Sequence, residues 1–561
     1  MDRETRRQIE EYRRREAGPI ENNLIDELVA GELDRQEFLR RAALFGLGAG
    51  TVGALLRLVG EADLALGAPA AAEQRRGGTL RVAITKPGAA IEPSRIDTVG
   101  AVGIVSIVGE YLTFTTPQGN LQPWLATSWR PNRDASVWTF QIRRGVRFHN
   151  GRRLTADDVV STFRVLTRKE SAAFSVFNGI LTPEGVRKTG PYTVQFRLEQ
   201  PTGAFPYLVS QTTYQGIILP ATYRVGSFIS AKMPATGPYR LQSYVEGRSA
   251  TFVRNDAYWG GRPLLDTVRV TMFESSTPQV LALRAGQVDL VQQVSALEAA
   301  PFAGNRRFQA FSTKTANHRQ FGMRTDQEKF RDPRVRRAIA LTLNRPGLVR
   351  SLWRGRAIVG NDSPFTPLFP STARDVPQRT QNLRQARQLL EAAGAENTSF
   401  TLTTWQNLEI PDYAQIIQRS ARQVGIDVKL EILSGGEYYG APPGQDYATS
   451  TPWLNREAVI TDYGHRPIPN VYLTAAFKTG GEWNQSRYSN PRFDAALRSY
   501  IAAVDLQTQR RYARQMQTIL LQDTPVIISY FYDWIALGSA KIRGYQPEGL
   551  GAIGLRRVWL A

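Results

Sequence analysis

The chain has 561 residues, which is too long for one ordinary domain and predicts about two to four lobes. Hydrophobic residues make up 42% of the sequence, as in folded globular proteins, and the lack of cysteine excludes disulfides, thiolate metal sites, cysteine nucleophiles and a lipid-modified cysteine. The formal net charge of +20 comes mainly from single arginines, not from a long basic run interleaved with aromatics, so a nucleic-acid partner is not expected.

The N-terminal 76 residues differ in composition from the rest. The charged stretch "RETRRQIEEYRRRE" predicts a solvated helix, and "NNLIDELVAGELDRQEFLRR" has helical apolar spacing. Residues 42–56 are uncharged but glycine-rich, and they are fewer than the roughly 20 apolar residues that a spanning helix needs. Small residues near Ala72 suit a signal peptidase, so we expect an export signal, with a retained membrane anchor over residues 42–60 as the alternative.

The same segment holds Gly48, Gly50 and Gly53 in the spacing G-x-G-x-x-G. A dinucleotide site needs a strand before this loop and an acidic residue on a second strand about 20 positions later. Here a charged helix precedes the loop and no predicted strand follows it, so no nucleotide or other cofactor is expected.

Folded sequence begins at "RGGTLRVAI", where apolar residues alternate as in a half-buried strand. In "VWTFQIRRGVRFHNGRRLTADDVVSTFRVL", Trp138, Phe140 and Ile142 alternate on one strand face, and an Asn-Gly pair makes a tight turn before a helix. Thr155 and Asp158 have the spacing of a capping box at the start of that helix. Capping explains the neighbouring carboxylates better than an acid-base pair does, because adjacent helical positions point apart.

Helices and strands alternate in the second half of the chain. Asp332 is expected to cap the helix in "DPRVRRAIALTLNR", and Asn344 is expected to cap the next helix. The stretch "NLRQARQLLEAAGA" is amphipathic, "FTLTTW" has strand character, and "YAQIIQRSARQVGIDVKLEIL" predicts a helix, a turn and a strand. This alternation predicts an open α/β sheet.

The three histidines, His149, His318 and His465, are isolated from one another in the sequence. None has a partner at the i,i+4 spacing of a zinc helix, so no metal site is expected. The sequence has neither a phosphate-binding G-x-x-x-x-G-K-[ST] loop nor a G-x-S-x-G nucleophile elbow. We therefore predict no catalytic residues, and we do not expect an enzyme.

Around "WTFQIRRGVRFHNGRRLTADDVVSTF" the chain resembles the family 5 extracellular solute-binding proteins, which are peptide- and nickel-type receptors of bacterial ABC importers. The resemblance continues in order through "GGTLRVAI", "LQPWLATSW", "TGPYRLQSYVEG", "RNDAYWGG", "LALRAGQVDLV", "DPRVRRAIALTLNR", "LRQARQLLEAAG", "RQVGIDVKLEIL", "SRYSNPRFDAAL" and "LLQDTPVIISYFY". It implies an α/β, two-lobed, periplasmic-binding-protein-like fold of type II in its large form, with a hinge between the lobes and a ligand cleft.

The resemblance also implies domain boundaries. Residues 1–76 form the N-terminal extension, residues 77–315 form lobe I with an inserted subdomain at about 110–232, residues 316–525 form lobe II, and residues 526–561 return to lobe I. Such a receptor makes and breaks no covalent bond; its ligand shifts the population toward a closed form that the permease and ATPase complex of an ABC transporter recognises. The expected location is the periplasm or the exterior of the cell envelope, without a lipid anchor.

In family members that bind peptides, an aspartate after a lobe II strand, followed by an aromatic residue, pairs with the amino terminus of the ligand. Asp462 and Tyr463 in "AVITDYGHRPIPNVYL" match this pattern. The next residues depart from it, and they add His465 and Arg466 to the candidate ligand-binding site. Arg466 would pair with Asp462 or bind a ligand carboxylate; the alternative is that Asp462 only caps the loop and Arg466 only lies on the rim.

Trp405, at the end of "TLTTW", is the aromatic candidate for the cleft wall, with a core tryptophan as the alternative. The predicted ligand is a short peptide or a similar charged solute. Within the same class, the alternatives are a nickel chelate, an oligosaccharide or an opine. From another class, the alternative is a secreted enzyme that uses the same scaffold.

Residues 34–40, "DRQEFLR", resemble the twin-arginine export motif, with Gln36 in place of the second arginine. The literal pair Arg40-Arg41 lacks the Phe-Leu that follows the arginines in that motif. Twin-arginine-like export is expected first and general secretion second. Cleavage would give a mature chain that starts near Glu73.

Overall fold

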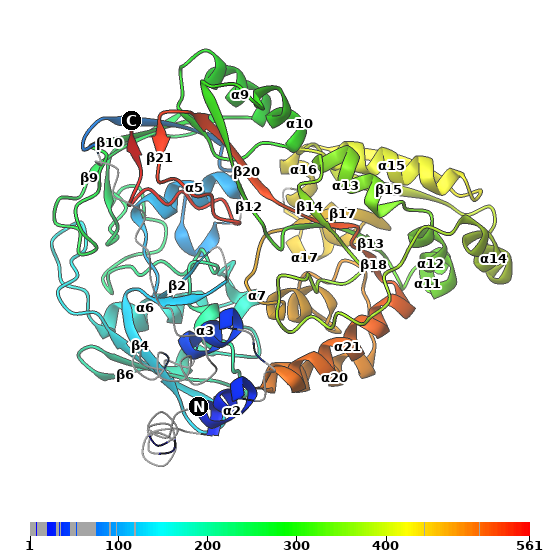
Figure 1. Cartoon of the computed structure of the whole chain (residues 1–561), viewed down its shortest axis with the longest axis horizontal. Helices are drawn as coiled ribbons and strands as arrows, with labels where there is room; N and C mark the ends of the chain where they lie inside the picture. Colours follow the sequence, from blue (N-terminus) through cyan, green and yellow to red (C-terminus); the bar gives the residue numbers. More distant parts are fainter. Residues whose placement is uncertain are drawn as a thin grey trace.

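Two mixed β-sheets form the centres of two lobes in the computed structural model (Figure 1). The structure describes residues 19–29, 33, 35–44 and 75–561 except 89–90, 97, 117–118, 443 and 504, together with the single residues 7, 10 and 52. In Figure 1 the first lobe lies on the left and the second lobe on the right, with the C-terminal strands returning to the first lobe. The predicted two-lobed α/β fold is confirmed.

The sheet of the first lobe has seven strands in the order β12-β20-β11-β1-β10-β9-β8. β1 pairs in parallel with β10 and β11, whereas β9 and β20 pair antiparallel with their neighbours. The strand predicted at the start of the folded sequence is confirmed, because Leu80, Val82 and Ile84 of β1 are all 0% exposed. The strands are β1 (Thr79–Thr85), β8 (Tyr239–Val245), β9 (Ser249–Arg254), β10 (Thr267–Phe273), β11 (Leu290–Val291), β12 (Phe308–Thr313) and β20 (Trp534–Ser539).

A four-stranded sheet in the order β4-β5-β7-β6 packs with helix α6 (Ala156–Leu166) in the first lobe. Trp138, Phe140 and Ile142 of β5 lie in one apolar core with this helix, and the capping box of Thr155 and Asp158 is present, as predicted. The strands are β4 (Ala126–Pro131), β5 (Val137–Ile142), β6 (Val186–Gly190) and β7 (Thr193–Arg197). The other elements of this lobe are α5 (Val99–Val108), α7 (Phe174–Phe177), α8 (Phe205–Leu208), α9 (Ser276–Arg284), α10 (Ala296–Ala299), β2 (Thr113–Thr115), β3 (Leu121–Pro123), β21 (Ile542–Arg543), β22 (Trp559–Leu560) and the short helices η1 (Pro93–Arg95), η2 (Pro183–Gly185) and η3 (Ala300–Phe302).

The sheet of the second lobe has the order β14-β19-β13-β17-β15-β16, and β18 also pairs with β13. β15 pairs in parallel with both β16 and β17, so the predicted helix-strand alternation does form an open α/β sheet. The strands are β13 (His318–Met323), β14 (Ala357–Val359), β15 (Ser399–Trp405), β16 (Asp427–Leu433), β17 (Ala458–Tyr463), β18 (Val526–Ile527) and β19 (Tyr530–Tyr532).

Helix ends in the second lobe follow the caps predicted from sequence. Asp332 Oδ1 accepts a hydrogen bond from Arg334 N at 2.7 Å, and Asn344 Oδ1 accepts one from Gly347 N at 2.9 Å. The helices are α11 (Glu328–Arg331), α12 (Pro333–Leu341), α13 (Arg345–Trp353), α14 (Leu383–Ala393), α15 (Ile410–Arg422), α16 (Gly435–Tyr439), α17 (Tyr447–Ser450), α18 (Pro452–Asn455), α19 (Asn470–Tyr472), η4 (Leu473–Phe477), α20 (Pro491–Ala502) and α21 (Leu506–Asp523).

The chain crosses between the two sheets at two adjacent places. One crossing joins β12 to β13, and the other joins β19 to β20 through Asp533. Thr315 Oγ1 donates to Tyr532 O at 2.6 Å and Tyr532 N donates to Asn317 O at 2.9 Å, so the crossings are bonded to each other. β18 and β19, within residues 526–532, pair in the second sheet, and β20 is the C-terminal strand that joins the first sheet. The lobe boundaries given above remain a prediction.

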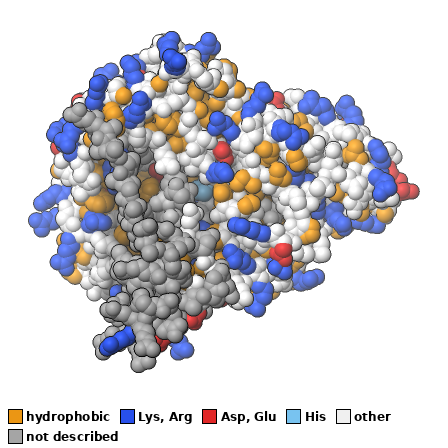
Figure 2. Space-filling model, viewed as in Figure 1, with side chains coloured by type: hydrophobic (Ala, Val, Ile, Leu, Met, Phe, Trp, Pro, Cys, Tyr) orange, Lys and Arg blue, Asp and Glu red, His pale blue; other side chains and the backbone are white. Residues whose placement is uncertain are grey.

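Two helices of the N-terminal region are described, α2 (Pro19–Val29) and α3 (Arg35–Leu44). The helix predicted in "RETRRQIEEYRRRE" lies outside the described residues apart from Arg7 and Glu10, as does most of the predicted anchor at residues 42–60. Among the described helices none is both long and apolar enough to cross a membrane. On the face that Figure 2 shows, Lys and Arg side chains are scattered over both lobes and do not gather in one patch.

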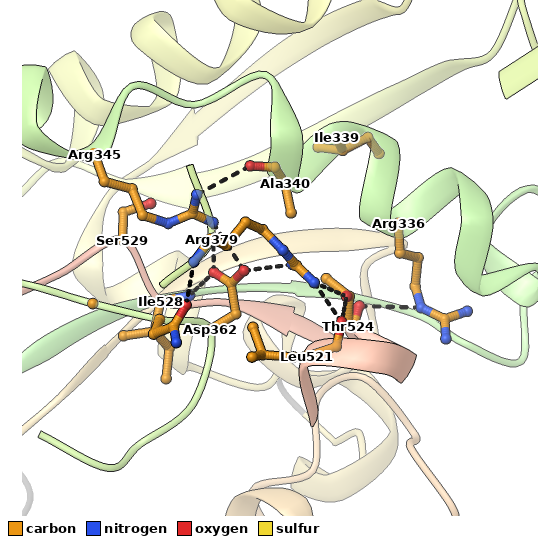
Figure 3. Close-up of polar contacts among 12 residues, drawn as sticks. Arg336, Ile339, Ala340, Arg345, Asp362, Arg379, Leu521, Thr524, Ile528 and Ser529 are labelled. Carbon is orange, nitrogen blue, oxygen red and sulfur yellow. Dashed lines mark hydrogen bonds and ion pairs between the residues drawn. The ribbon is translucent and has the colours of Figure 1, made fainter. Parts of the chain in front are cut away.

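A buried ionic cluster fixes the interior of the second lobe (Figure 3). The carboxylate of Asp362 accepts from Arg345 Nη2 at 2.8 and 2.9 Å and from Arg379 Nη1 at 2.5 Å, and all three side chains are at most 9% exposed. Asp362 Oδ1 also accepts from Ile528 N at 3.2 Å, and Arg379 Nη2 donates to Thr524 Oγ1 at 3.1 Å. The cluster therefore ties the loop after β14 to the segment between α21 and β19.

We predict that Asp362→Asn destabilises the protein by about 3 kcal/mol, because it leaves two buried guanidinium groups without a carboxylate. Asparagine tolerates the left-handed backbone at this position, where φ is 53°, so the loss measures the charge and not backbone strain. Chemical denaturation gives the free energy of unfolding.

The matched control is Asp375→Asn, whose ion pair with Arg514 at 2.7 Å joins two side chains that are more than half exposed. An exposed pair contributes less than about 1 kcal/mol. Equal losses in the two variants would contradict a stabilising role for the Asp362 cluster.

Candidate functional site

The predicted site residues lie at the carboxyl ends of the parallel strands β15 and β17. Trp405 ends β15, and Asp462 and Tyr463 end β17. In open α/β sheets this edge is where ligands bind, because loops rather than further strands follow it. The loop after β17 then reaches the first lobe, where His465 and Arg466 contact residues of that lobe.

Asp462 is held by a buried arginine that the sequence did not identify. Arg319 on β13 forms ion pairs with both Asp462 and Glu409; its Nε lies 2.8 Å from Glu409 Oε1. Burial opposes the charge of Arg319, but the two carboxylates outweigh burial and hold its pKa well above the ordinary value. Tyr532 donates its hydroxyl to Asp462 Oδ1 at 2.8 Å, and the Arg319 guanidinium lies 4.3 Å from the centre of the Tyr532 ring.

The charges of this cluster do not cancel. Arg319 and Glu409 have fully buried side chains, whereas the side chain of Asp462 is 22% exposed. One guanidinium thus faces two carboxylates, and the surplus negative charge has access to the surface only at Asp462. A desolvated carboxylate with an open side attracts a cation more strongly than a fully hydrated one does.

Trp405 lies in an aromatic group with Tyr438 and Tyr439 at the end of β15. Its ring centre is 5.2 Å from that of Tyr439 in a perpendicular arrangement and 6.5 Å from that of Tyr438 in a parallel one. Burial, followed by the charges of Tyr438 and Asp462, raises the pKa of Tyr439 well above its ordinary value, and a hydrogen bond with the backbone of Asp462 opposes this rise. Trp405 is half-buried, and its buried Nε1 has no hydrogen-bond partner among the described residues.

Tyr463 lies on the side of β17 opposite to Asp462, as expected for consecutive residues of a strand. Its ring stacks on His318 with centres 5.4 Å apart, and its hydroxyl donates to Trp483 O at 3.1 Å. It is 4% exposed within an apolar core of the second lobe. The structure does not bring Tyr463 together with Asp462, so a direct ligand contact by Tyr463 remains only a prediction.

His465 and Arg466 contact the hinge and the first lobe. The half-buried His465 accepts a hydrogen bond at Nδ1 from Ala316 N at 3.0 Å, which requires a neutral ring with its proton on Nε2. Burial, Arg466 and Arg40 lower the pKa of His465 to about 3. Arg466 does not pair with Asp462; its Nη1 donates to His465 O at 2.9 Å and its guanidinium lies 5.7 Å from the centre of the Tyr214 ring of the first lobe.

Two buried polar groups of this region are incompletely satisfied or perturbed. Arg466 is 8% exposed, and its Nε has no hydrogen-bond partner among the described residues. Glu548, which sequence reasoning missed, lies in the loop that packs on His465 through Gly549. Burial raises the pKa of Glu548 to about 7, although a hydrogen bond with Gln211 acts in the opposite direction. In the described part of the chain, no group of three or more His, Asp or Glu side chains could hold a metal ion.

Sequence signals for the missed residues are weak. Arg319, Glu409, Tyr532 and Glu548 lie far apart in the chain, and only the sheet order brings β13, β17 and β19 side by side. The pair Tyr438-Tyr439 is a visible aromatic signal, because it stands in the short helix α16 directly after β16. No local pattern distinguishes a buried arginine in a strand from an exposed one.

The sequence model of the bacterial extracellular solute-binding proteins, family 5 (middle region), matches residues 120–485. The oligopeptide-binding protein AppA of Bacillus subtilis is 25% identical over 535 residues, which cover 88% of this chain and 93% of that protein. The nickel-binding protein NikA of Staphylococcus aureus is 23% identical over 490 residues, which cover 86% of this chain and 94% of that protein.

A solved structure of similar fold is that of the ABC transporter-associated periplasmic binding protein DppA from Helicobacter pylori in complex with the peptide STSA. It superposes with a TM-score of 0.73 at 22% identity and covers 87% of this chain and 98% of that chain. The shared fold extends over both lobes.

We predict that protonation of His465 opposes folding in acid. Its pKa is lowered from an ordinary value of about 6.5 to about 3, so between these pH values the unfolded chain binds a proton that the folded chain does not. The free energy of unfolding therefore falls as the pH decreases below about 6.5.

His465→Asn, which can still accept from Ala316 N, should lose less stability than the parent between pH 7 and pH 4, by on the order of 1 kcal/mol for a half-buried ring. Denaturant titrations at several pH values measure this difference, and carboxylate titrations common to both proteins cancel in it. If the free energies of unfolding of the two proteins changed with pH in parallel, the lowered pKa of His465 would be contradicted.

Proposed function

The chain belongs to the bacterial extracellular solute-binding proteins of family 5, and from this premise we propose that it captures short peptides, or similar charged solutes with a free amino group, between its two lobes. It then presents them to the permease and ATPase complex of an ABC importer. It performs no covalent chemistry; its work is reversible capture. Peptide-binding relatives such as AppA support this ligand class, and the nickel-binding relative marks the main alternative.

The observation that carries the proposal is the partly exposed carboxylate of Asp462. The surplus negative charge of its cluster suits one ammonium group, and the buried Arg319 fixes the carboxylate in place before the ligand arrives. Tyr439, which interacts with Asp462, and Trp405, which packs on Tyr439, offer aromatic surface to a ligand side chain. A zwitterionic ligand would use Arg466, with its free Nε, for a carboxylate.

Closure follows from the two crossings between the sheets. The short connections at Thr315 and Asp533 are the only covalent joints between the lobes in residues 75–561, apart from the undescribed positions, so small rotations there change the cleft. A ligand bonded to Asp462 on one lobe and to first-lobe groups such as Glu548 gains contacts only when the lobes approach. It therefore shifts the population toward the closed form.

A chelated metal or an opine is the second candidate. Arg466, whose buried Nε has no hydrogen-bond partner among the described residues, suits a ligand carboxylate, which chelators and opines carry. Direct coordination by a set of protein side chains finds no support among the described residues, so a metal would bring its own chelator.

The receptor would function outside the cytoplasm. Its family consists of extracellular proteins, and the leader-like residues 34–72 provide an export signal of twin-arginine-like or general secretory type. N-terminal sequencing of the native protein distinguishes a cleaved leader, with a start near Glu73, from a retained one.

We predict that Asp462→Asn weakens binding of amine-bearing peptides by at least about tenfold, because it removes the charge that meets the ammonium. Asparagine keeps the acceptor for Tyr532, so the thermal midpoint of the free protein should change little. Native mass spectrometry with a mixture of short peptides identifies ligands, and calorimetry with each peptide and its N-acetylated form measures the affinities.

The control variant is Asp412→Asn, which removes an exposed carboxylate on α15 of the same lobe and should leave the peptide affinity unchanged. If a peptide and its N-acetylated form bound the parent protein with equal affinity, Asp462 would be removed from the site. Stabilisation by a nickel-histidine chelate or an opine, with none by any peptide, would replace the peptide proposal with the second candidate.

A further inference from the structure

The N-terminal helices α2 and α3 lie against both lobes at once. In Figure 1 they occupy the space below the first-lobe sheet, next to the end of α20 and the start of α21 of the second lobe. A cavity of about 50 Å³ at this junction is bounded by residues of α3, of the first lobe and of the second lobe. The two helices thus form a second connection between the lobes, far from the two crossings of the hinge in sequence.

Arg40 on α3 joins the lobes through one guanidinium group. Its Nε donates to the hydroxyl of Tyr207 in the first lobe at 2.9 Å, and its Nη2 donates to Pro467 O in the second lobe at 2.8 Å. Tyr207 in turn donates to Gly119 O at 3.0 Å. Arg40 is 7% exposed, so these hydrogen bonds are sheltered from water and cannot be exchanged for hydration without moving α3.

Arg41 and Glu27 fasten the same helices to the second lobe. Arg41 donates from Nη1 to Glu27 Oε2 at 3.2 Å and from Nη2 to Gln509 Oε1 on α21 at 3.2 Å. Glu27 Oε1 accepts from Leu506 N, the first residue of α21, at 3.0 Å. A carboxylate at this end of an 18-residue helix also meets the positive end of the helix dipole.

Apolar side chains of α2 and α3 also pack against the two lobes. Phe38 and Ile25 are 0% exposed and belong to the apolar core that also holds the four-stranded sheet of the first lobe. The same core includes Val471 and Leu506 of the second lobe. Burial of a phenylalanine and several aliphatic side chains is a large driving force for docking, on the order of 2 kcal/mol for each large side chain.

We infer that α2 and α3 form an intramolecular clasp, which holds the two lobes at one separation in the full-length chain and frees them when it is removed or displaced. The clasp contacts Pro467, which lies directly after His465 and Arg466, so it restrains the loop that carries candidate ligand-binding groups. The unprocessed chain would therefore open its cleft less readily than a chain that has lost the clasp.

The clasp also hides the leader-like motif. The docked form uses the guanidinium groups of Arg40 and Arg41 and buries Phe38, while Gln36 stays exposed. Any partner that binds the side chain of Phe38 or those of Arg40 and Arg41 must first displace α3. Docking and such recognition therefore exclude each other, because both need the same side chains.

Spin labels on the two lobes test the clasp directly. The natural chain has no cysteine, so Arg133→Cys in the first lobe and Gln415→Cys in the second, both at exposed positions, give two specific labels in the full-length protein. Pulsed electron resonance should give one narrow distance distribution without ligand. Arg40→Ala and Phe38→Asp should each broaden it or add a second population, and the control Gln36→Ala on the exposed side of α3 should not.

Limited proteolysis gives an independent readout on the same proteins. Trypsin should cut after Arg41 at least about tenfold faster in Phe38→Asp than in the parent or in Gln36→Ala, because cleavage follows the population of the undocked helix. Circular dichroism and the thermal midpoint verify that the lobes remain folded. Unchanged distances in both clasp variants, or a parent that is cut after Arg41 as fast as they are, would overturn the inference. Neither readout uses a ligand, so both are independent of the peptide-binding proposal.

Discussion

One buried guanidinium, that of Arg319, organises the second lobe next to the hinge. It pairs with Glu409 at the start of α15 and with Asp462 at the end of β17, and it stacks on Tyr532 of β19. A buried arginine must satisfy its donors inside the protein, because the cost of an unpaired buried charge is several kcal/mol. That requirement fixes the relative positions of the strands and of the Asp462 carboxylate.

The second lobe balances this cluster with another of opposite sign. Arg319 faces two carboxylates, whereas Asp362 faces two guanidinium groups, so the surplus charges are one negative and one positive. Two aromatic side chains lie between them: Tyr530 donates to Glu409 at 2.9 Å, and Tyr413, whose ring centre is 5.2 Å from that of Tyr530, bonds with Ser529. The surplus charges of the two clusters are opposite, and the exposed edge of the negative cluster lies at Asp462.

The loop after β17 connects the proposed ligand site, the hinge crossing and the proposed clasp of α2 and α3. His465 accepts from Ala316 of the hinge crossing, Arg466 faces Tyr214 of the first lobe, and Pro467 accepts from Arg40 of α3. Because these contacts lie on consecutive residues, the three structures share one short segment of the chain. Ligand capture and release of the N-terminal helices would thus act on the same short segment, and each would alter the other by linkage.

Sequence patterns alone predict the local elements and the two-lobed fold class, and they single out Asp462 as a candidate for ligand binding. Alternation in β1 and β5, the capping box at α6 and the helix-strand order of the second lobe depend on neighbours within a few residues, and motifs along most of the chain carry the family resemblance. Only the tertiary structure decided that Arg319 holds Asp462, that Tyr463 lies on the opposite side of its strand, and that α3 spans both lobes. These facts depend on contacts between residues tens to hundreds of positions apart, which the order of strands in a sheet creates and which no local pattern encodes.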